Sequence, residues 1–175
     1  MTAGQIRDTI RSVLCRGLTF EQAEQITRVL VPMRTAAGHP LMREGDNPTG
    51  LFVLLTGSVE ILKQTPEGSL QSIAKLEAPT VLGEMSLLME RPHSATVQAV
   101  TDCEFHLLTR SQFQRLISSE SVAAYKLIVT IAEVLAARVA RLDQKVLELS
   151  ARREGAAPVE ELAAFKQKLF SEWRF

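Results

Sequence analysis

The chain has 175 residues, 46% of them hydrophobic, which suffices for one domain with its own core plus short appendages. Twenty basic and twenty acidic residues cancel, so no net charge attracts nucleic acid or a basic partner. The N-terminus lacks a charged start followed by an apolar run, and no stretch approaches the ~20 apolar residues of a membrane span, so we expect a cytoplasmic protein without membrane contact.

Two short helices are predicted at the start of the chain. Ile6, Ile10 and Leu14 recur at helical spacing. Thr19-Phe20-Glu21-Gln22 has the pattern of a capping box and opens a second helix that extends to about Val31.

From Met33 to Leu108 the pattern changes to brief apolar or alternating runs, which indicate an antiparallel β-barrel or jelly roll over about residues 33–110. The runs are separated by turn residues: Gly38, Pro40, Gly45, Pro48-Thr49-Gly50, Gly57, Pro66-Glu67-Gly68 and Pro79. Cys15 and Cys103 lack metal-type spacing, so we expect small buried hydrophobes in a reducing compartment.

Residues 81–97 combine a flexible turn, one helical turn and a polar return into a strand. Gly83 can let the backbone approach a ligand closely. The amides of Met85 and Ser86, at the start of the short helix, would point at negative charge. This segment therefore predicts an anion pocket.

The spacing of this segment resembles the phosphate-binding cassette of the cyclic nucleotide-binding domain family, which reads Phe-Gly-Glu, two residues, Leu-Leu, then Arg-Ser-Ala-Thr-Val. Glu44-Gly45-Asp46 and residues 51–61 are similar to the family's first turn and its strand-Gly-strand signature. The resemblance covers about two-thirds of the chain. It implies an α+β fold: a β-roll with N-terminal helices and a long C-terminal helix.

The resemblance also implies roles for the cassette residues. Glu84 would accept a hydrogen bond from a ribose 2′-hydroxyl, and Ser86 and Ser94 offer hydroxyls beside the expected phosphate. The same side chains can instead act locally, as a helix-start charge or as backbone caps, and Thr96 can be structural. The candidate ligand-binding residues are Gly83, Glu84, Met85, Ser86, Arg91, His93, Ser94, Ala95 and Thr96.

His93 stands where the family places the arginine that holds the cyclic phosphate. An imidazole, with an ordinary pKa of about 6.5, is mostly neutral at pH 7, whereas arginine presents a permanent fork of donors. Arg91 could reach the phosphate from another direction, with Pro92 shaping the loop, or could be a solvated surface residue. Ala78-Pro79-Thr80 replaces the family's Gly-Asp, so the preceding loop is expected to be stiffer.

A helix is predicted over about residues 111–152, with apolar residues in a heptad pattern. Two interleaved series lie seven residues apart: Ile128, Leu135, Leu142 and Leu149, and Ala132, Val139 and Val146. Small or β-branched residues alternating with Leu or Ile favour a parallel two-stranded coiled coil, and hence a homodimer. The alternative is a helix packed on its own barrel.

Residues 153–175 are predicted to form a linker and a terminal amphipathic helix, separate from a domain over residues 1–152. The apolar positions are Val159, Leu162, Phe165, Leu169 and Trp173. This helix would either pack on the domain or cover the barrel mouth as a lid. Only about 25 residues follow the long helix, too few for a winged helix-turn-helix, so we expect no direct DNA binding.

Three functions compete. The first is a cyclic-nucleotide-type sensor, with cAMP or cGMP as possible ligand, no required cofactor, and an unidentified output protein. The second is a dimeric interaction module that has lost the ligand. The third, a metal-dependent cupin-type enzyme, is disfavoured because His39, His93 and His106 do not form a His-one-residue-His pair. We expect no enzymatic activity.

Overall fold

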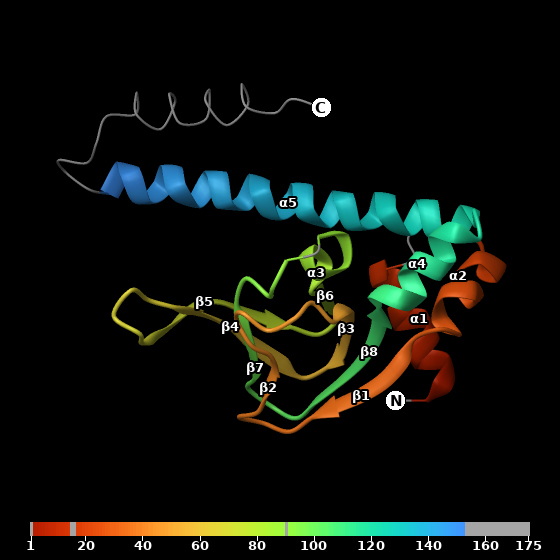
Figure 1. Cartoon of the computed structure of the whole chain (residues 1–175), viewed down its shortest axis with the longest axis horizontal. Coiled ribbons are helices and arrows are strands. Elements are labelled where there is room, and N and C mark those ends of the chain that lie inside the picture. Colours follow the sequence, from red (N-terminus) through yellow and green to blue (C-terminus); the bar gives the residue numbers. More distant parts are fainter. Residues whose placement is uncertain (1, 15–16, 90, 153–175) are drawn as a thin grey trace. The chain divides into compact units, whose positions relative to one another are not determined.

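The computed structural model describes residues 2–14, 17–89 and 91–152 (Figure 1). The helices are α1 (Ala3–Leu14), α2 (Phe20–Thr27), α3 (Glu84–Leu88), α4 (Arg110–Ser118) and α5 (Val122–Arg152). The strands are β1 (Val31–Thr35), β2 (Pro40–Met42), β3 (Gly50–Thr56), β4 (Ser58–Gln64), β5 (Leu70–Glu77), β6 (Thr80–Leu82), β7 (Thr96–Ala99) and β8 (Cys103–Thr109). Residues 1–132 form one compact unit, and a second unit begins at Glu133 within α5.

The described strands form two four-stranded antiparallel sheets, ordered β1-β8-β3-β6 and β2-β7-β4-β5. In Figure 1 the hairpin of β4 and β5 extends beyond the rest of the roll. The predicted fold class is confirmed: an α+β chain with N-terminal helices, a β-roll and a long C-terminal helix.

The core of the roll contains side chains from both sheets. Phe52 of β3 and Phe105 of β8 meet edge to face at its centre, with ring centroids 6.2 Å apart. Such pairs contribute beyond the area they bury. The buried members of this core are Met42, Phe52, Leu54, Val59, Leu82, Val97, Ala99, Cys103 and Phe105.

Strand β3 is buried on both faces, which explains its continuous apolar run. Successive side chains of a strand point to opposite faces. Phe52 and Leu54 face the core of the roll. Leu51, Val53 and Leu55 therefore point to the opposite face, and all three are buried. Helix α1 contacts β3.

The two N-terminal helices form as predicted. Ile10 and Leu14 of α1 are buried, and the capping box of Thr19 with Gln22 begins α2. Helix α2 ends at Thr27 rather than near Val31, and Val31 begins β1. Val31 precedes a proline, and the proline ring disfavours helical geometry at the residue before it.

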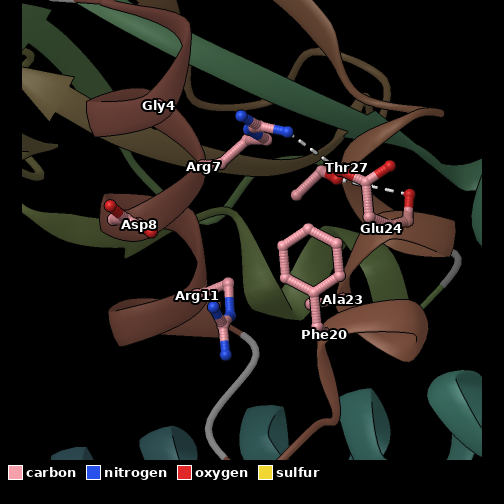
Figure 2. Close-up of a pocket in the computed structure, with 8 residues that line it drawn as sticks. All are labelled: Gly4, Arg7, Asp8, Arg11, Phe20, Ala23, Glu24 and Thr27. Atoms are coloured by element: carbon pink, nitrogen blue, oxygen red, sulfur yellow. Dashed lines mark hydrogen bonds and ion pairs between the residues drawn. The ribbon is translucent and has the colours of Figure 1, made fainter.

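A surface groove lies between α1 and α2 (Figure 2). Arg7 Nη1 lies 3.5 Å from Glu24 Oε1, and the guanidinium of Arg11 lies 5.7 Å from the ring centre of Phe20. The cavity volume is about 100 Å³, below the roughly 300 Å³ at which small-molecule pockets begin. The groove is the contact region between α1 and α2, and its volume is too small for a nucleotide.

The helix predicted over about 111–152 is in fact two helices, α4 and α5. The break falls at a polar run that bonds locally: Ser119 Oγ donates to Leu116 O at 2.7 Å, and Ser121 Oγ accepts from Ala123 N at 3.2 Å. Glu120 adopts a left-handed φ of 51°. The heptad pattern lies entirely within α5.

Cys103 is buried in the core of the roll, and this burial raises the pKa of its thiol. The interpretation as a small buried hydrophobe is confirmed for Cys103. Cys15 and the predicted terminal helix at Val159–Trp173 lie outside the described residues. Among the described helices, none is both long and apolar enough to cross a membrane.

We expect Gly57→Ala to destabilise the fold more than Gly68→Ala. Both glycines have a left-handed φ, +89° and +84°, so the backbone strain is similar. A Cβ on Gly57 would lie 2.5 Å from Asp102 O and 2.7 Å from Cys103 Sγ, whereas open space surrounds Gly68. The extra overlap should cost about 1–3 kcal/mol more at Gly57. Urea denaturation measures both variants, and equal losses would contradict the steric argument.

Candidate functional site

The turn before α3 requires glycine for two reasons. Gly83 is the N-cap residue of α3, with a left-handed φ of 77°. A Cβ at Gly83 would overlap the carbonyl oxygen of Gly50, at the start of β3. The backbone of the turn therefore lies directly on β3, and α3 contacts the same strand.

Helix α3 separates buried from exposed side chains. Glu84 and Ser86 are buried, at 6% and 5% exposure, together with Leu87. Met85, the predicted neighbour of an anion, is 45% exposed. Glu84 thus places a buried carboxylate at the first residue of a short helix, and it has an interaction partner within the fold, as buried acidic side chains generally do.

His93 is held internally by hydroxyl groups. Its side chain is 5% exposed, Nδ1 lies 2.8 Å from Ser86 Oγ, and Nε2 lies 3.2 Å from Thr49 Oγ1. Its backbone N–H donates to Asp46 O, and its carbonyl accepts from Gly45 N, both at 2.9 Å. Burial lowers the pKa of His93, and the negative charge of Asp46 opposes this shift. The ring is therefore expected to be neutral at pH 7.

The end of the cassette is hydrogen-bonded to the turn after β2 and to β4. Thr96, the first residue of β7, accepts a hydrogen bond at Oγ1 from Glu44 N at 3.0 Å. Lys63 Nζ of β4 donates to Ser94 O at 2.6 Å and pairs with Glu44 Oε1 at 2.5 Å. The hydrogen bond and charge of Lys63, and the hydrogen bond that Gln64 N donates to Oε2, lower the pKa of Glu44. Ala95 is half-buried.

Arg110, the first residue of α4, reaches the end of α3. Its Nη1 donates to Ser86 O at 2.7 Å and to Met89 O at 2.8 Å. Its backbone N–H points to Thr49 O at 3.4 Å. Helix α4 begins with the capping box of Thr109 and Gln112, which fixes the backbone at Arg110.

The structure brings some predicted site residues together and leaves others apart. Ser86 and His93 are hydrogen-bonded, and Ser94 Oγ lies 4.0 Å from the sulfur of Met85. Arg91 is exposed. Sequence reasoning missed Thr49 and Arg110, because both reach the cassette only through the tertiary fold.

The histidines do not form a metal centre. His39 is exposed, with Nδ1 3.2 Å from Ala37 O, while His93 bonds to hydroxyls. Within residues 2–14, 17–89 and 91–152, no group of three or more His, Cys, Asp or Glu side chains is placed to hold a metal ion.

A sequence profile described as Cyclic nucleotide-binding domain matches residues 32–120, half of the chain. The match begins at the second residue of β1 and ends just beyond α4, so it includes the other seven strands in full, the cassette and Arg110.

Curated relatives include a kinase and a bacterial receptor protein. The cGMP-dependent protein kinase egl-4 of Caenorhabditis elegans is 33% identical over 112 residues, which are 63% of this chain and only 14% of the kinase. The Cyclic AMP receptor protein of Thermus thermophilus is 29% identical over 146 residues, 83% of this chain and 67% of that protein.

Among solved structures, a cyclic nucleotide-binding domain from Methylobacillus flagellatus superimposes with a TM-score of 0.75. The superposition covers 84% of this chain and 83% of that one, at 24% sequence identity. At this identity the likeness establishes the fold alone.

We expect the folded protein to lose stability on acidification. Burial lowers the pKa of His93 and of His106, whose buried Nδ1 finds no hydrogen-bond partner among the described residues. As pH falls below the ordinary value of 6.5, the unfolded chain binds protons that the folded protein does not, so the free energy of unfolding decreases.

Urea denaturation at about pH 7.5 and about pH 5.5 tests this linkage. His93→Gln retains a donor and an acceptor but does not titrate, so it should reduce the acid sensitivity. His39→Gln, at an exposed ring, is the matched control and should behave as wild type. If His93→Gln and wild type lose equal stability between the two pH values, His93 does not carry the effect.

Proposed function

The chain belongs to the cyclic nucleotide-binding domain family, and from this premise we propose that it is a sensor for a cyclic nucleotide, cAMP or cGMP. The proposed site is the cassette at residues 83–96. The output passes through α5 to a partner protein rather than to DNA, because the chain has no net charge.

The observation that carries this proposal is the burial of Glu84 behind Gly83. Gly83 lets the cassette backbone lie against β3, and Glu84 follows it as a carboxylate only 6% exposed. An ionised carboxylate accepts hydrogen bonds and cannot donate them. A ribose 2′-hydroxyl is a suitable donor, which supports a nucleoside ligand over a simple anion.

A second function, a ligand-free interaction module with the same fold, is favoured by His93. Both ring nitrogens of His93 already have hydroxyl partners, in Ser86 and Thr49. A phosphate must compete with these bonds or bind beside them. The two functions differ in whether a nucleotide binds at all.

We further propose a parallel homodimer through α5. Val139 and Leu142 are 58% and 63% exposed, although both occupy predicted core positions of the heptad pattern. Large apolar side chains at such exposure on one helical stripe are typical of an interaction surface. Leu135 and Val146 are half-buried, and the side chain of Leu149 lies outside the described residues.

Charges beside the seam fit the parallel orientation. With Val139 and Leu142 in the core, Arg138 and Asp143 occupy the two positions that flank it. In a parallel pair, the residue at the first flanking position faces the residue five positions further along the other helix. Arg138 of one copy would then face Asp143 of the other, in both directions.

Isothermal titration with cAMP and cGMP tests the sensor. We expect Glu84→Gln to weaken binding about ten- to a hundredfold, the effect of a hydrogen bond to a charged group. The matching 2′-deoxy nucleotide lacks the proposed donor, so wild type should bind it as weakly as Glu84→Gln binds the normal nucleotide. Glu84→Gln should not weaken the binding of the 2′-deoxy nucleotide further. Glu77→Gln, at an exposed position of β5, is the control. No binding of either nucleotide by wild type would leave the interaction module.

The dimer is tested by light scattering at micromolar concentration. Wild type should have twice the chain mass of 19.3 kDa. Leu135→Glu/Leu142→Glu should run as a monomer, because each charge would be buried without a partner at a cost of several kcal/mol, roughly. Ala137→Glu/Gln144→Glu adds the same charges on the opposite face of the helix and should stay dimeric. A monomeric wild type would refute the dimer.

A further inference from the structure

Four residues from four parts of the chain form a closed series of hydrogen bonds, which we call the cassette circuit. Thr49 Oγ1 lies 3.2 Å from His93 Nε2, and His93 Nδ1 lies 2.8 Å from Ser86 Oγ. Ser86 O accepts from Arg110 Nη1 at 2.7 Å, and the Arg110 backbone N–H returns to Thr49 O at 3.4 Å. The circuit joins the β2–β3 loop, α3, the cassette return and α4.

The position of Arg110 is unfavourable for α4 and favourable for α3. A cation at the first residue of a helix opposes the positive end of the helix dipole. The same guanidinium lies at the carboxyl end of α3, where Ser86 O and Met89 O accept from it. A cation at that end is stabilising. The contacts of Arg110 therefore serve the cassette more than the helix that carries it.

Ser86 joins the two halves of the circuit. Its side chain bonds to His93 and its carbonyl to Arg110, so displacement of either partner acts on one buried residue. Contiguous hydrogen-bonded side chains on rigid elements can carry energetic coupling between two sites. Arg110 is half-buried at the base of α4, three residues before the buried Phe113.

We propose that Arg110 is a positioning residue that couples the cassette to α4, and that His93 acts through it as an internal brace. A change at His93 moves Ser86 and is transmitted to α4 through the guanidinium. The use of this coupling in signalling rests on the proposed function. The coupling itself requires no ligand.

Amide hydrogen exchange without nucleotide tests the coupling, read in α3 at Leu87–Met89 and in α4 at residues 113–118. His93→Phe keeps a ring of similar size but removes both ring nitrogens. We expect it to speed exchange about tenfold in both helices, the change that corresponds to one hydrogen bond of about 1.4 kcal/mol. In an Arg110→Met background, His93→Phe should speed exchange in α3 and leave α4 unchanged.

Two outcomes overturn the proposal: α4 unchanged by His93→Phe in the wild-type background, or equally changed in both backgrounds. Arg115→Met, on the exposed face of α4, is the matched control and should preserve the coupling. Arg110→Lys retains the positive charge and should preserve part of the coupling between the cassette and α4. A purely steric role of Arg110 would not predict this. If circular dichroism shows Arg110→Met unfolded, Arg110→Gln replaces it. Because nucleotide is absent, failure here is independent of any failure to bind cAMP or cGMP.

Discussion

The arrangement of the cassette depends on a close approach of three backbone segments that leaves no room for side chains. A Cβ on Gly83 would overlap the carbonyl of Gly50, and a Cβ on Gly50 would overlap the carbonyl of Leu108. The turn before α3, the start of β3 and the end of β8 therefore lie side by side in close contact, in the sheet order β8-β3-β6. This backbone contact places α3 against β3, and a side chain at Gly50 or Gly83 would force the segments apart.

The polar contacts of the site follow from that close approach. Thr49 precedes Gly50 and Arg110 comes two residues after Leu108, so both are delivered to the cassette by the strands that carry the close approach. Ser86 and His93 then meet them from the cassette side. The bond between Ser86 and His93 is buried and those of Thr49 and Arg110 are partly buried, and buried polar groups are costly when left unsatisfied. The backbone contact thus brings the four residues of the circuit together. Their hydrogen bonds in turn favour this one arrangement of the cassette.

Local patterns in the sequence predict most of the helices and strands. They do not predict contacts between residues that are far apart in the chain. The capping box at Thr19, the helical spacing of α1 and the alternation of the roll depend on residues near one another in the chain. The break at Glu120 is hard to predict because serine runs carry only a weak helix-ending signal, whereas the pattern Thr-x-x-Gln at Thr109 marks the start of α4. In the site, the sequence shows that His93 stands at the position of the family's arginine, but it does not predict the hydrogen-bond partners of His93. Thr49 and Arg110 lie 44 and 17 positions from it.

The exchange of arginine for histidine alters what the cassette requires. A guanidinium keeps its charge at any working pH, so a buried one needs an anion or several acceptors. A neutral imidazole needs only one donor and one acceptor, and the hydroxyls of Ser86 and Thr49 can supply both. Both ring nitrogens of His93 therefore have partners within the fold. A phosphate that binds here must be held by groups other than a permanent cation at position 93, or must displace hydroxyl bonds of comparable strength. An anion would therefore gain less binding free energy from His93 than from an arginine, because the neutral imidazole supplies no charge and its nitrogens already have partners.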